Sequence, residues 1–426
     1  MFDRQRRLPR PAIRALLILL ATLALPALSA AGEFVVSPPA VTLNGNFDRA
    51  QLLVADPAGG PDHAADLTLQ AAYRSSDPGV VTVSLAGRLL AEGNGTATVT
   101  VSVGGVDHAV PITVQGVTAK PAIRFSEQVL PIISKAGCNA GACHGSQFGK
   151  GGFKLSVFAF DPAADHRNIT RDSLSRRVDL VDPAHSLFLL KPIGAVSHGG
   201  GQRLVKGSVD YRILVSWLGG GAPGPDAKAP KVTALHVEPA RRIGPEGFEQ
   251  QLRVVASCED GMSRDVTDWA KYDSTEEGVV QVTPAGRYRT VGPGQGAVMV
   301  RFEGRAVLAS VTVPGKGAAD LSGWTDQNAI DHLAAAKFRE IGLTPSPLCD
   351  DAAFLRRAFF DAVGAPPTVE QAKAFLDSTD PDKRRKLIDR LLGQTGDPAQ
   401  DTFNDAYAAY WTCLLYTSDA ADDLTR

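Results

Sequence analysis

Two cysteines and a histidine lie within seven positions, at Cys138, Cys143 and His144, in the stretch SKAGCNAGACHGSQFGKGGFKLS (residues 134–156). Covalent attachment of haem needs two thiols that form thioethers with the vinyl groups and a histidine beside the second thiol that reaches the iron. The usual local signature is C-x-x-C-H, and here the spacer between the cysteines is longer. The pattern predicts a haem c bound through Cys138 and Cys143, with His144 as an axial ligand to the iron.

Two other kinds of site use the same residue types. In an oxidising compartment Cys138 and Cys143 could form a plain disulfide, with His144 incidental. Two cysteines and a histidine could also hold zinc, although the adjacent Cys143 and His144 would then both have to turn toward one tetrahedral ion. The motif alone leaves these alternatives open, as well as ordinary surface histidines.

A haem iron with two axial ligands needs a second side chain further along the chain. Methionine commonly fills this role in small c-type domains, but no methionine lies between Met1 and Met262. The segment 120–225 offers three histidines instead, and His198 is the best placed because it comes just before the closing VDYRILVSWLGG helix. The three candidates are His166, His185 and His198.

The residues around His198 suit a flat macrocycle. Three glycines follow it, at 199–201, and glycine lets a backbone approach a ring without a Cβ clash. Arg203 could neutralise a haem propionate, since a guanidinium matches a carboxylate. In the helix that follows, helical spacing places Tyr211, Leu214 and Trp217 on one stripe, which would pack against haem or the N-terminal helix of the segment.

Ordered motifs give residues 120–225 a resemblance to the cytochrome c-like domains of exported planctomycete proteins. They are GGFKL (151–155), VDPAHSLF (181–188) and DYRILVSWL (210–218), after the cysteine–histidine motif. His198 stands where that family has its methionine, so the resemblance implies His144/His198 ligation and transfer of single electrons. His185 ranks second, because its place in those domains holds a solvent-facing residue.

The N-terminus has the order of a secretory signal peptide over residues 1–31. A leader rich in arginine precedes an apolar run from Ala15 to Leu25, and small residues follow. The run is shorter than the roughly 20 residues that a membrane-spanning helix needs. An uncleaved anchor is the alternative. Either way we expect the rest of the chain to be exported, to the periplasm or cell surface, with no transmembrane span in the mature chain.

Composition restricts the class of protein. A chain of 426 residues allows two to four domains, and 44% hydrophobic with 21% charged residues is ordinary for globular proteins. A net charge of −2 gives no basic footprint for nucleic acid. Five cysteines are too few for a disulfide scaffold. No G-x-S-x-G or H-E-x-x-H motif occurs, so we expect an electron-transfer domain rather than a catalytic one.

A long repeat predicts two related β-domains. The segment GVVTVSLAGRLLAEGNGTATVTVSVGG (79–105) matches GVVQVTPAGRYRTVGPGQGAVMVRFEG (278–304) at a constant offset. Alternation of apolar and polar residues in TATVTVSV is typical of a half-buried strand. Both copies resemble bacterial group 2 immunoglobulin-like domains, which we place at 33–117 and 231–314. That resemblance implies β-sandwiches that serve as spacers or make contact with a cell surface or polysaccharide.

Beyond residue 320 the apolar spacing becomes helical, and residues 322–412 are predicted to begin an all-α domain. The stretch FLRRAFFDAVGAPPT (354–368) resembles the opening of an uncharacterised helical domain of large exported planctomycete proteins. That family has no chemistry that can be transferred to these residues.

The last residues have a different character. CLLYTSDAADD (413–423) reads as the translation of a sequencing-library adaptor, so we expect 413–426 to be an artefact; a natural helical continuation is the alternative.

The sequence therefore predicts a multidomain chain with two all-β sandwiches, one mainly α cytochrome c-like domain and one truncated all-α domain. Its expected role is that of an exported haem c protein that passes single electrons to an unidentified redox partner. The alternative is a haem-free surface adhesion or scaffold protein in which Cys138 and Cys143 form a disulfide.

Overall fold

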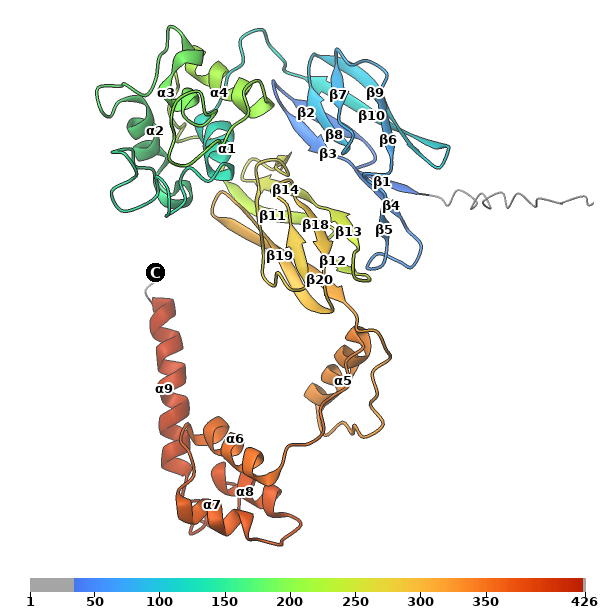
Figure 1. The fold of residues 1–426 in the computed structure, drawn as a ribbon, viewed down its shortest axis with the longest axis vertical. Coiled ribbons are helices and arrows are strands. Elements are labelled where there is room, and N and C mark those ends of the chain that lie inside the picture. Colours follow the sequence, from blue (N-terminus) through green and yellow to red (C-terminus); the bar gives the residue numbers. More distant parts are fainter. Residues whose placement is uncertain (1–33, 424–426) are drawn as a thin grey trace, which may run out of the picture. The chain divides into compact units, whose positions relative to one another are not determined.

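The computed structural model describes residues 34–423 (Figure 1). Two compact units divide the chain: residues 1–319 with 325–343, and residues 320–324 with 344–426. The predicted signal peptide, residues 1–31, lies outside the described part. Among residues 34–423, no helix is at once long and apolar enough to cross a membrane.

The first β-domain consists of three small sheets with the strand orders β1-β4-β5, β2-β10-β9-β6 and β3-β8-β7. Its longest pair, β9 and β10, is antiparallel, and β2 adds to β10 in parallel. Its strands are β1 (Val35–Ser37), β2 (Val41–Asn44), β3 (Arg49–Gln51), β4 (Leu53–Asp56), β5 (Ala65–Asp66), β6 (Ala72–Ser75), β7 (Val81–Val83), β8 (Arg88–Ala91), β9 (Gly95–Val103) and β10 (Val106–Gln115).

The second β-domain repeats this arrangement strand for strand, with the orders β11-β14-β15, β12-β20-β19-β16 and β13-β18-β17. The predicted duplication is thus present in the topology as well as in the sequence. Its strands are β11 (Val232–Glu238), β12 (Arg241–Ile243), β13 (Glu249–Gln251), β14 (Arg253–Cys258), β15 (Ser263–Asp265), β16 (Lys271–Ser274), β17 (Val280–Val282), β18 (Arg287–Thr290), β19 (Gly294–Phe302) and β20 (Arg305–Val313).

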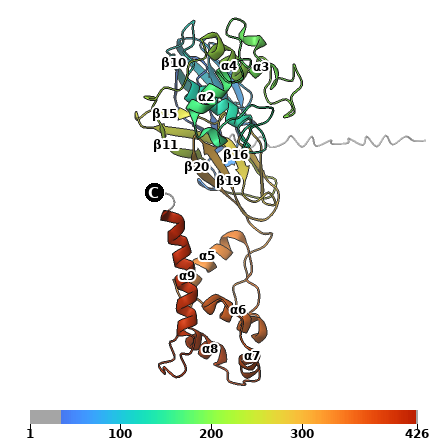
Figure 2. The same cartoon turned by 90° about the vertical axis from the view of Figure 1, so that its left-hand side faces the viewer.

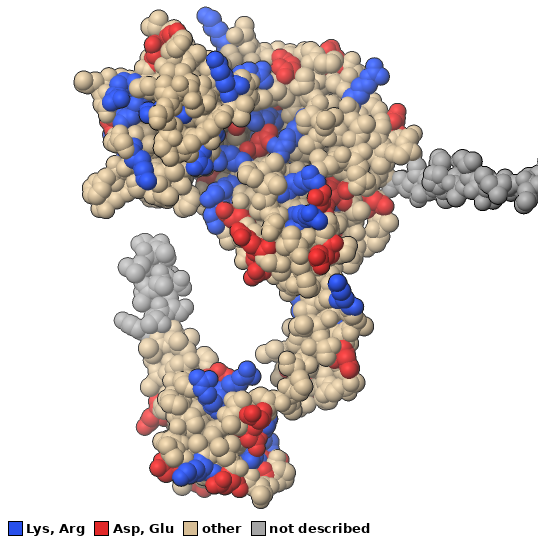
Figure 3. Space-filling view, in the orientation of Figure 1, with Lys and Arg blue, Asp and Glu red and all other residues tan. Residues whose placement is uncertain are grey.

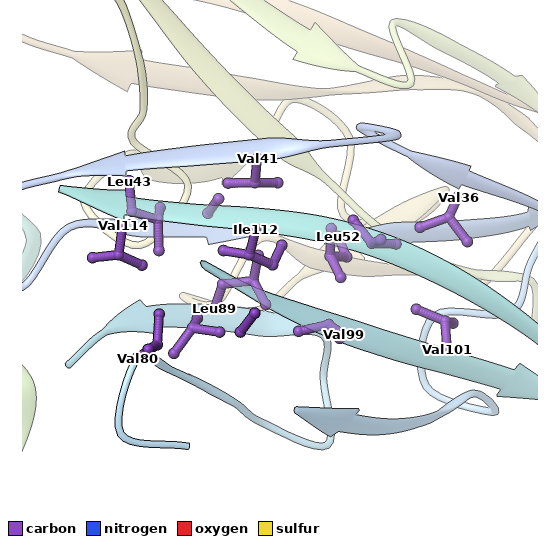
Figure 4. Packing of buried hydrophobic residues seen from close by; sticks show 14 of the residues in the cluster. Val36, Val41, Leu43, Leu52, Val80, Leu89, Val99, Val101, Ile112 and Val114 are labelled. Atoms are coloured by element: carbon purple, nitrogen blue, oxygen red, sulfur yellow. The ribbon is translucent and has the colours of Figure 1, made fainter. Parts of the chain in front are cut away.

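Each domain has its own apolar core between the sheets. In the first, Val99 lies opposite Val110 in the β9–β10 register, and both side chains are fully buried. Figure 4 shows Val99 among the other buried side chains of this core. Leu52, between β3 and β4, and Leu89, in β8, pack into the same core. Burial of one such side chain contributes about 1.5–3 kcal/mol, so the alternating pattern holds the sheets together.

A tyrosine and a glycine recur at equivalent places in the two copies. The hydroxyl of Tyr73 donates to the carbonyl of Thr68 at 2.7 Å, and that of Tyr272 donates to Thr267 at 2.8 Å. A Cβ on Gly286, which has a φ of 75°, would lie 2.6 Å from the Tyr272 ring. The repeated A-G-R turn therefore needs glycine both for its φ and for the space that the tyrosine occupies.

The two β-domains contact each other through equivalent residues. The backbone N–H of Gln51 donates to the Asp265 carboxylate at 3.0 Å. The backbone N–H of Gln251 donates to the carboxylate of Asp66, the equivalent aspartate of the first copy. This reciprocal exchange is the pattern of a two-fold interface, here formed within one chain.

Residues 120–225 form a segment of short helices and loops between the β-domains in the chain, and its assignment as a cytochrome c-like domain stays a prediction. Its core surrounds Trp217, which is fully buried, and the Trp217 ring lies 5.5 Å from that of Phe125 between centroids. The predicted stripe of Tyr211, Leu214 and Trp217 is buried. Its helices are η1 (Phe125–Val129), α1 (Leu130–Lys135), η2 (Val157–Ala159), α2 (Pro162–Thr170), η3 (Pro183–His185), α3 (Leu187–Leu190) and α4 (Val209–Gly219).

Lys135, the last residue of α1, carries its ammonium into a buried place. Its Nζ donates to the carbonyl of Ala270 at 2.5 Å and lies 4.8 Å from the Tyr272 ring centre. Burial, with a smaller contribution from Arg88, lowers the pKa of Lys135 to about 7. An unfolded lysine keeps its proton to about pH 10.4.

The stability of the first unit should therefore rise between pH 7 and pH 9 by more in the natural protein than in a Lys135→Met variant. In that interval the unfolded chain binds the proton and the folded chain does not, so higher pH favours folding. We expect a difference on the order of 1 kcal/mol, because partial solvation reduces the full effect. Urea unfolding at both pH values measures it, with Lys150→Met, at an exposed lysine, as the control. Equal slopes for all three proteins would contradict the prediction.

The remaining helices follow residue 320. Helix α5 (Ala329–Ile341) belongs to the first unit, where Glu340 pairs with Arg241 at 2.7 Å. The second unit has its own core around Leu355 and Phe359, and its small helical fold can be followed in Figure 2. Its helices are α6 (Asp351–Val363), α7 (Val369–Leu376), α8 (Lys383–Leu391) and α9 (Asn404–Asp423). Helix α9 continues through Cys413, and the adaptor origin of 413–426 stays a prediction.

Candidate functional site

The cysteine–histidine motif forms a compact loop directly after α1. The helix ends before Gly137, which has a φ of 77°, and the backbone amide of Cys138 donates to the carbonyl of Ile133 at 3.0 Å across this helix end. The amide of His144 then returns to the carbonyl of Cys138, also at 3.0 Å. The longer spacer therefore forms a closed loop that starts at Cys138 and ends at Cys143 and His144. All three side chains are partly buried.

A backbone carbonyl fixes the ring of His144. Its Nδ1 lies 3.0 Å from the carbonyl oxygen of Phe153, and the two rings pack with centroids 4.6 Å apart. Because a carbonyl can only accept, Nδ1 must carry the proton, which leaves the lone pair on Nε2. A histidine held in this tautomer is prepared for a metal ligand's role, since ligating histidines usually donate their other ring N–H in this way.

A backbone carbonyl also fixes the ring of His198. Its Nδ1 lies 2.8 Å from the carbonyl oxygen of Gly201, so its lone pair is also on Nε2. Gly201 has a φ of 72°, a conformation that glycine adopts without strain. A Cβ on Gly200 would lie 3.0 Å from the His198 ring, so the glycine run shapes the loop around this imidazole.

The structure brings His144 and His198 together. Their ring centroids are 6.3 Å apart and their planes differ by 15°. Two metal–imidazole bonds of about 2.0 Å, with about 1 Å from each nitrogen to its ring centre, sum to about 6 Å. The centroid separation is of the size that two imidazoles holding one metal ion would give.

The electrostatics of the loop favour neutral ligands. Burial is the main cause that lowers the pKa of His144, and the nearby His198 adds to the effect. Burial also raises the pKa of the Cys138 thiol to about 11, with Arg203 opposing the shift. These shifts favour the uncharged form of the His144 imidazole and the protonated form of the Cys138 thiol.

The two competing sites fit these residues less well. Cys138 and Cys143 are free thiols in the structure, so the disulfide of the scaffold alternative is not formed. Zinc needs four ligands, and the adjacent Cys143 and His144 would both have to turn toward one ion. Among the described residues, no three His, Cys, Asp or Glu side chains are grouped as a metal site requires. A haem would need fewer side-chain ligands than zinc, because the porphyrin itself would supply four of the ligands to the iron.

The other two histidines of the segment have different surroundings. Nε2 of His166 lies 2.8 Å from the carbonyl of Ala222, and its ring packs edge-on to Phe125, so it belongs to the core. His185 is exposed, with Nδ1 2.6 Å from the Asp182 carboxylate. Within residues 34–423, His198 is the one of the three candidate second ligands whose ring packs near that of His144.

Arg203 is close to the pair but has a local partner, because its Nε donates to the carbonyl of Gly200 at 2.7 Å. Sequence reasoning missed two neighbours. Phe153 was noted only as part of GGFKL, yet it both packs on His144 and binds its Nδ1. Arg177 lies over the Phe153 ring at 4.6 Å, and only its place upstream of the VDPAHSLF motif could have drawn attention to it.

The loop should not tolerate a side chain at residue 145. A Cβ on Gly145 would lie 2.3 Å from the carbonyl oxygen of Asn139, inside the loop that carries His144. We expect Gly145→Ala to destabilise the segment by about 1–3 kcal/mol, as overpacking does. Gly141→Ala is the matched control, because a Cβ there meets nothing within 4 Å. Thermal unfolding of both variants measures the difference, and equal melting temperatures would contradict the prediction.

Large apolar side chains are exposed more often in this segment than in either β-domain. Nine are exposed in residues 120–225, against four in residues 33–117 and two in residues 231–314. Phe148, close to the motif, is 82% exposed. Such side chains are typical of a binding surface when they gather in one domain. The nine are Phe148, Val157, Phe158, Phe160, Leu174, Leu180, Val181, Val196 and Val205.

Comparison with known families covers only the C-terminal part of the chain. Residues 329–424 match a family described as "PSCyt2: Protein of unknown function (DUF1549)". This agrees with the expected uncharacterised helical domain, and it assigns no chemistry. The match does not reach residues 120–225. No curated protein matches the sequence.

Solved structures give distant similarities. S-layer protein SbsC domains 5–6 align at 12% identity and a TM-score of 0.26, over 66% of this chain and 98% of that one. The longer S-layer protein rSbsC(31-844) aligns at 12% identity and a TM-score of 0.17, over 63% of this chain, which spans about a quarter (24%) of that protein. The adhesin InvE of Yersinia pseudotuberculosis aligns at 12% identity and 0.14, over 66% of this chain and 58% of that one. TM-scores this low do not establish a shared fold, and nothing is inferred from them.

Proposed function

We propose that this chain is an exported multidomain protein whose residues 120–225 carry a covalent haem c and pass single electrons. The observation that carries the proposal is the pair His144 and His198, with nearly parallel rings at 6.3 Å and both lone pairs on Nε2. Cys138 and Cys143 precede His144 as free thiols, which thioether bonds require.

The chain's own residues would hold the iron and keep its ligands oriented. His144 and His198 would hold the iron from both sides, and the carbonyls of Phe153 and Gly201 would keep the two rings in place. When bound, haem supplies a one-electron couple, and a histidine rather than a methionine as second ligand favours a lower potential. Because His144 and His198 would both hold the iron, the site would suit electron transfer rather than binding of a substrate to the metal.

The direct test is covalent attachment. The full chain is produced in a host with a c-type maturation system, and its visible spectrum and a haem stain after denaturing electrophoresis are recorded. We expect a coloured protein whose stain survives denaturation. A Cys138→Ser/Cys143→Ser variant should be colourless on the gel. A colourless natural protein, matured beside a known c-type cytochrome as positive control, would falsify the proposal.

A second function rests on a different observation, the reciprocal contacts between the two β-domains. Paired sandwiches form a spacer, and a haem-free surface scaffold or adhesion protein would need nothing more from residues 120–225 than a folded connector. The two functions differ in the haem stain, which only the first produces. They share the expectation of export, which cell fractionation with an antibody to the mature chain tests.

A further inference from the structure

The surroundings of the histidine pair are cationic and lack acidic partners. Residues 120–225 hold 13 Lys and Arg against 7 Asp and Glu, a net charge of +6, whereas the whole chain has −2. On the face drawn in Figure 3, Lys and Arg side chains predominate over the part where Figure 1 labels α2 and α3. The rest of the chain is therefore acidic, and the positive charge is concentrated in the candidate haem segment.

Four of these cations belong to the loops that hold the two histidines or donate hydrogen bonds to them. Arg177 donates to the carbonyl of Gly152 at 2.9 Å and Arg203 to that of Gly200 at 2.7 Å. Lys191 donates to the carbonyl of Ser197, the residue before His198, at 3.1 Å. Lys150 is exposed, and its backbone pairs with that of Phe153, whose carbonyl binds His144.

None of the four forms an ion pair in the described part of the chain. The side-chain hydrogen bonds of Arg177, Lys191 and Arg203 go to backbone carbonyls and to one serine hydroxyl, so no carboxylate in the described residues balances these charges. The nearest acidic influence is Asp172, which acts on Arg177. A haem would bring two propionates, which could balance two cations at most. A positive rim would therefore remain around the site.

We propose that this rim, formed by Lys150, Arg177, Lys191 and Arg203, docks the acidic face of a redox partner protein. The inference rests on the proposed haem function and adds the chemistry of the partner. Complementary charge steers encounter and raises association rates, most at low salt. The exposed Phe148 beside the motif adds apolar contact of the kind that a transient interface uses.

Two small oxidants of opposite charge test the rim in the haem-loaded full chain. The reduced protein is mixed in a stopped-flow instrument with ferricyanide, an anion, or with tris(phenanthroline)cobalt(III), a cation, at low and high ionic strength. We expect salt to slow the reaction with ferricyanide and to accelerate the reaction with the cobalt complex. Poly-L-glutamate, the probe for an extended acidic surface, should slow oxidation by ferricyanide at low salt.

Charge reversal at the two lysines should remove these effects. In Lys150→Glu/Lys191→Glu, which leaves both arginines in place, the ferricyanide rate at low salt should fall about tenfold, within the range of electrostatic steering. Poly-L-glutamate should then have no effect. Lys228→Glu/Lys316→Glu changes the same charge at exposed lysines outside the segment and should keep the natural rates within about twofold.

The outcomes separate the two proposals. A coloured protein with salt responses that are absent or of the opposite sign overturns the docking surface alone. Equal loss of rate in both double variants also overturns it, because the effect would then follow net charge. A colourless protein overturns the haem function, and the docking surface with it. An unchanged visible spectrum in the variants shows that they are folded.

Discussion

Alanine at position 198 is expected to leave haem attached but to remove one of its two axial ligands. Both thiols and His144 remain in a His198→Ala variant, so covalent attachment should persist. The His198 ring is held by Gly201 only through its Nδ1, and no other histidine contacts His144 in the described residues, so nothing replaces it. The visible spectrum should change completely, from six-coordinate low-spin to five-coordinate high-spin iron.

Rescue makes this expectation specific. Free imidazole added to His198→Ala should restore the low-spin spectrum, because it can occupy the position that the side chain left. His198→Met should instead give a six-coordinate site with a higher potential, as a methionine ligand does. His185→Ala is the matched control, since His185 is exposed and bonded to Asp182. A natural spectrum in His198→Ala would show that the second ligand lies elsewhere.

The β-domains could be predicted well from the sequence, because the alternation of apolar and polar residues that forms their strands is local and occurs in both copies. Alternation in TATVTVSV places Val99 and Val101 inward, and both are fully buried. The pairing of the two copies could not be predicted. It depends on the Asp66 and Asp265 carboxylates reaching backbone amides far away in sequence, and no local pattern specifies that.

At the candidate site the sequence identified the reactive types but not their orientation. Cys138, Cys143 and His144 stand out by spacing alone, whereas His198 was chosen over His185 because of its place in a family pattern. The carbonyls that fix the two rings, from Phe153 and Gly201, are backbone atoms, which every residue has. Only their conformation gives them a role, so no residue type could indicate them in advance.

In the second unit the helices could be predicted from the sequence, but the role of its cavity could not. Helical apolar spacing predicts an all-α domain here, and the structure adds a capping box formed by Thr368 and Gln371 at the start of α7. Arg357 and Asp361 line a cavity of about 430 Å³ together with Cys349, Tyr407 and Trp411. Neither the sequence nor the family match indicates what chemistry this cavity serves, since the matched family is itself of unknown function.

Removal of the Trp217 side chain is expected to have the largest effect on stability of any single change in the helical segment. Trp217 is fully buried, and its Nε1–H donates to the carbonyl of Pro223 at 2.9 Å. Its ring contacts those of Phe125, His166 and Phe188. Trp217→Ala leaves a cavity where these aromatic rings meet, and such substitutions cost about 3–5 kcal/mol.

That loss would be a large share of the stability of one domain, typically about 5–15 kcal/mol. We therefore expect Trp217→Ala to unfold residues 120–225 selectively, with faster amide hydrogen exchange in α1 and α4 and unchanged exchange in β9, β10, β19 and β20. Trp217→Phe keeps most of the packing and should exchange at intermediate rates. Phe148→Ala removes an aromatic ring that is 82% exposed and should leave exchange as it is. If Trp217→Ala also loosened the strands of both sandwiches, the segment would not be an independent folding unit, and the haem-loading tests would have to be read on the whole first unit.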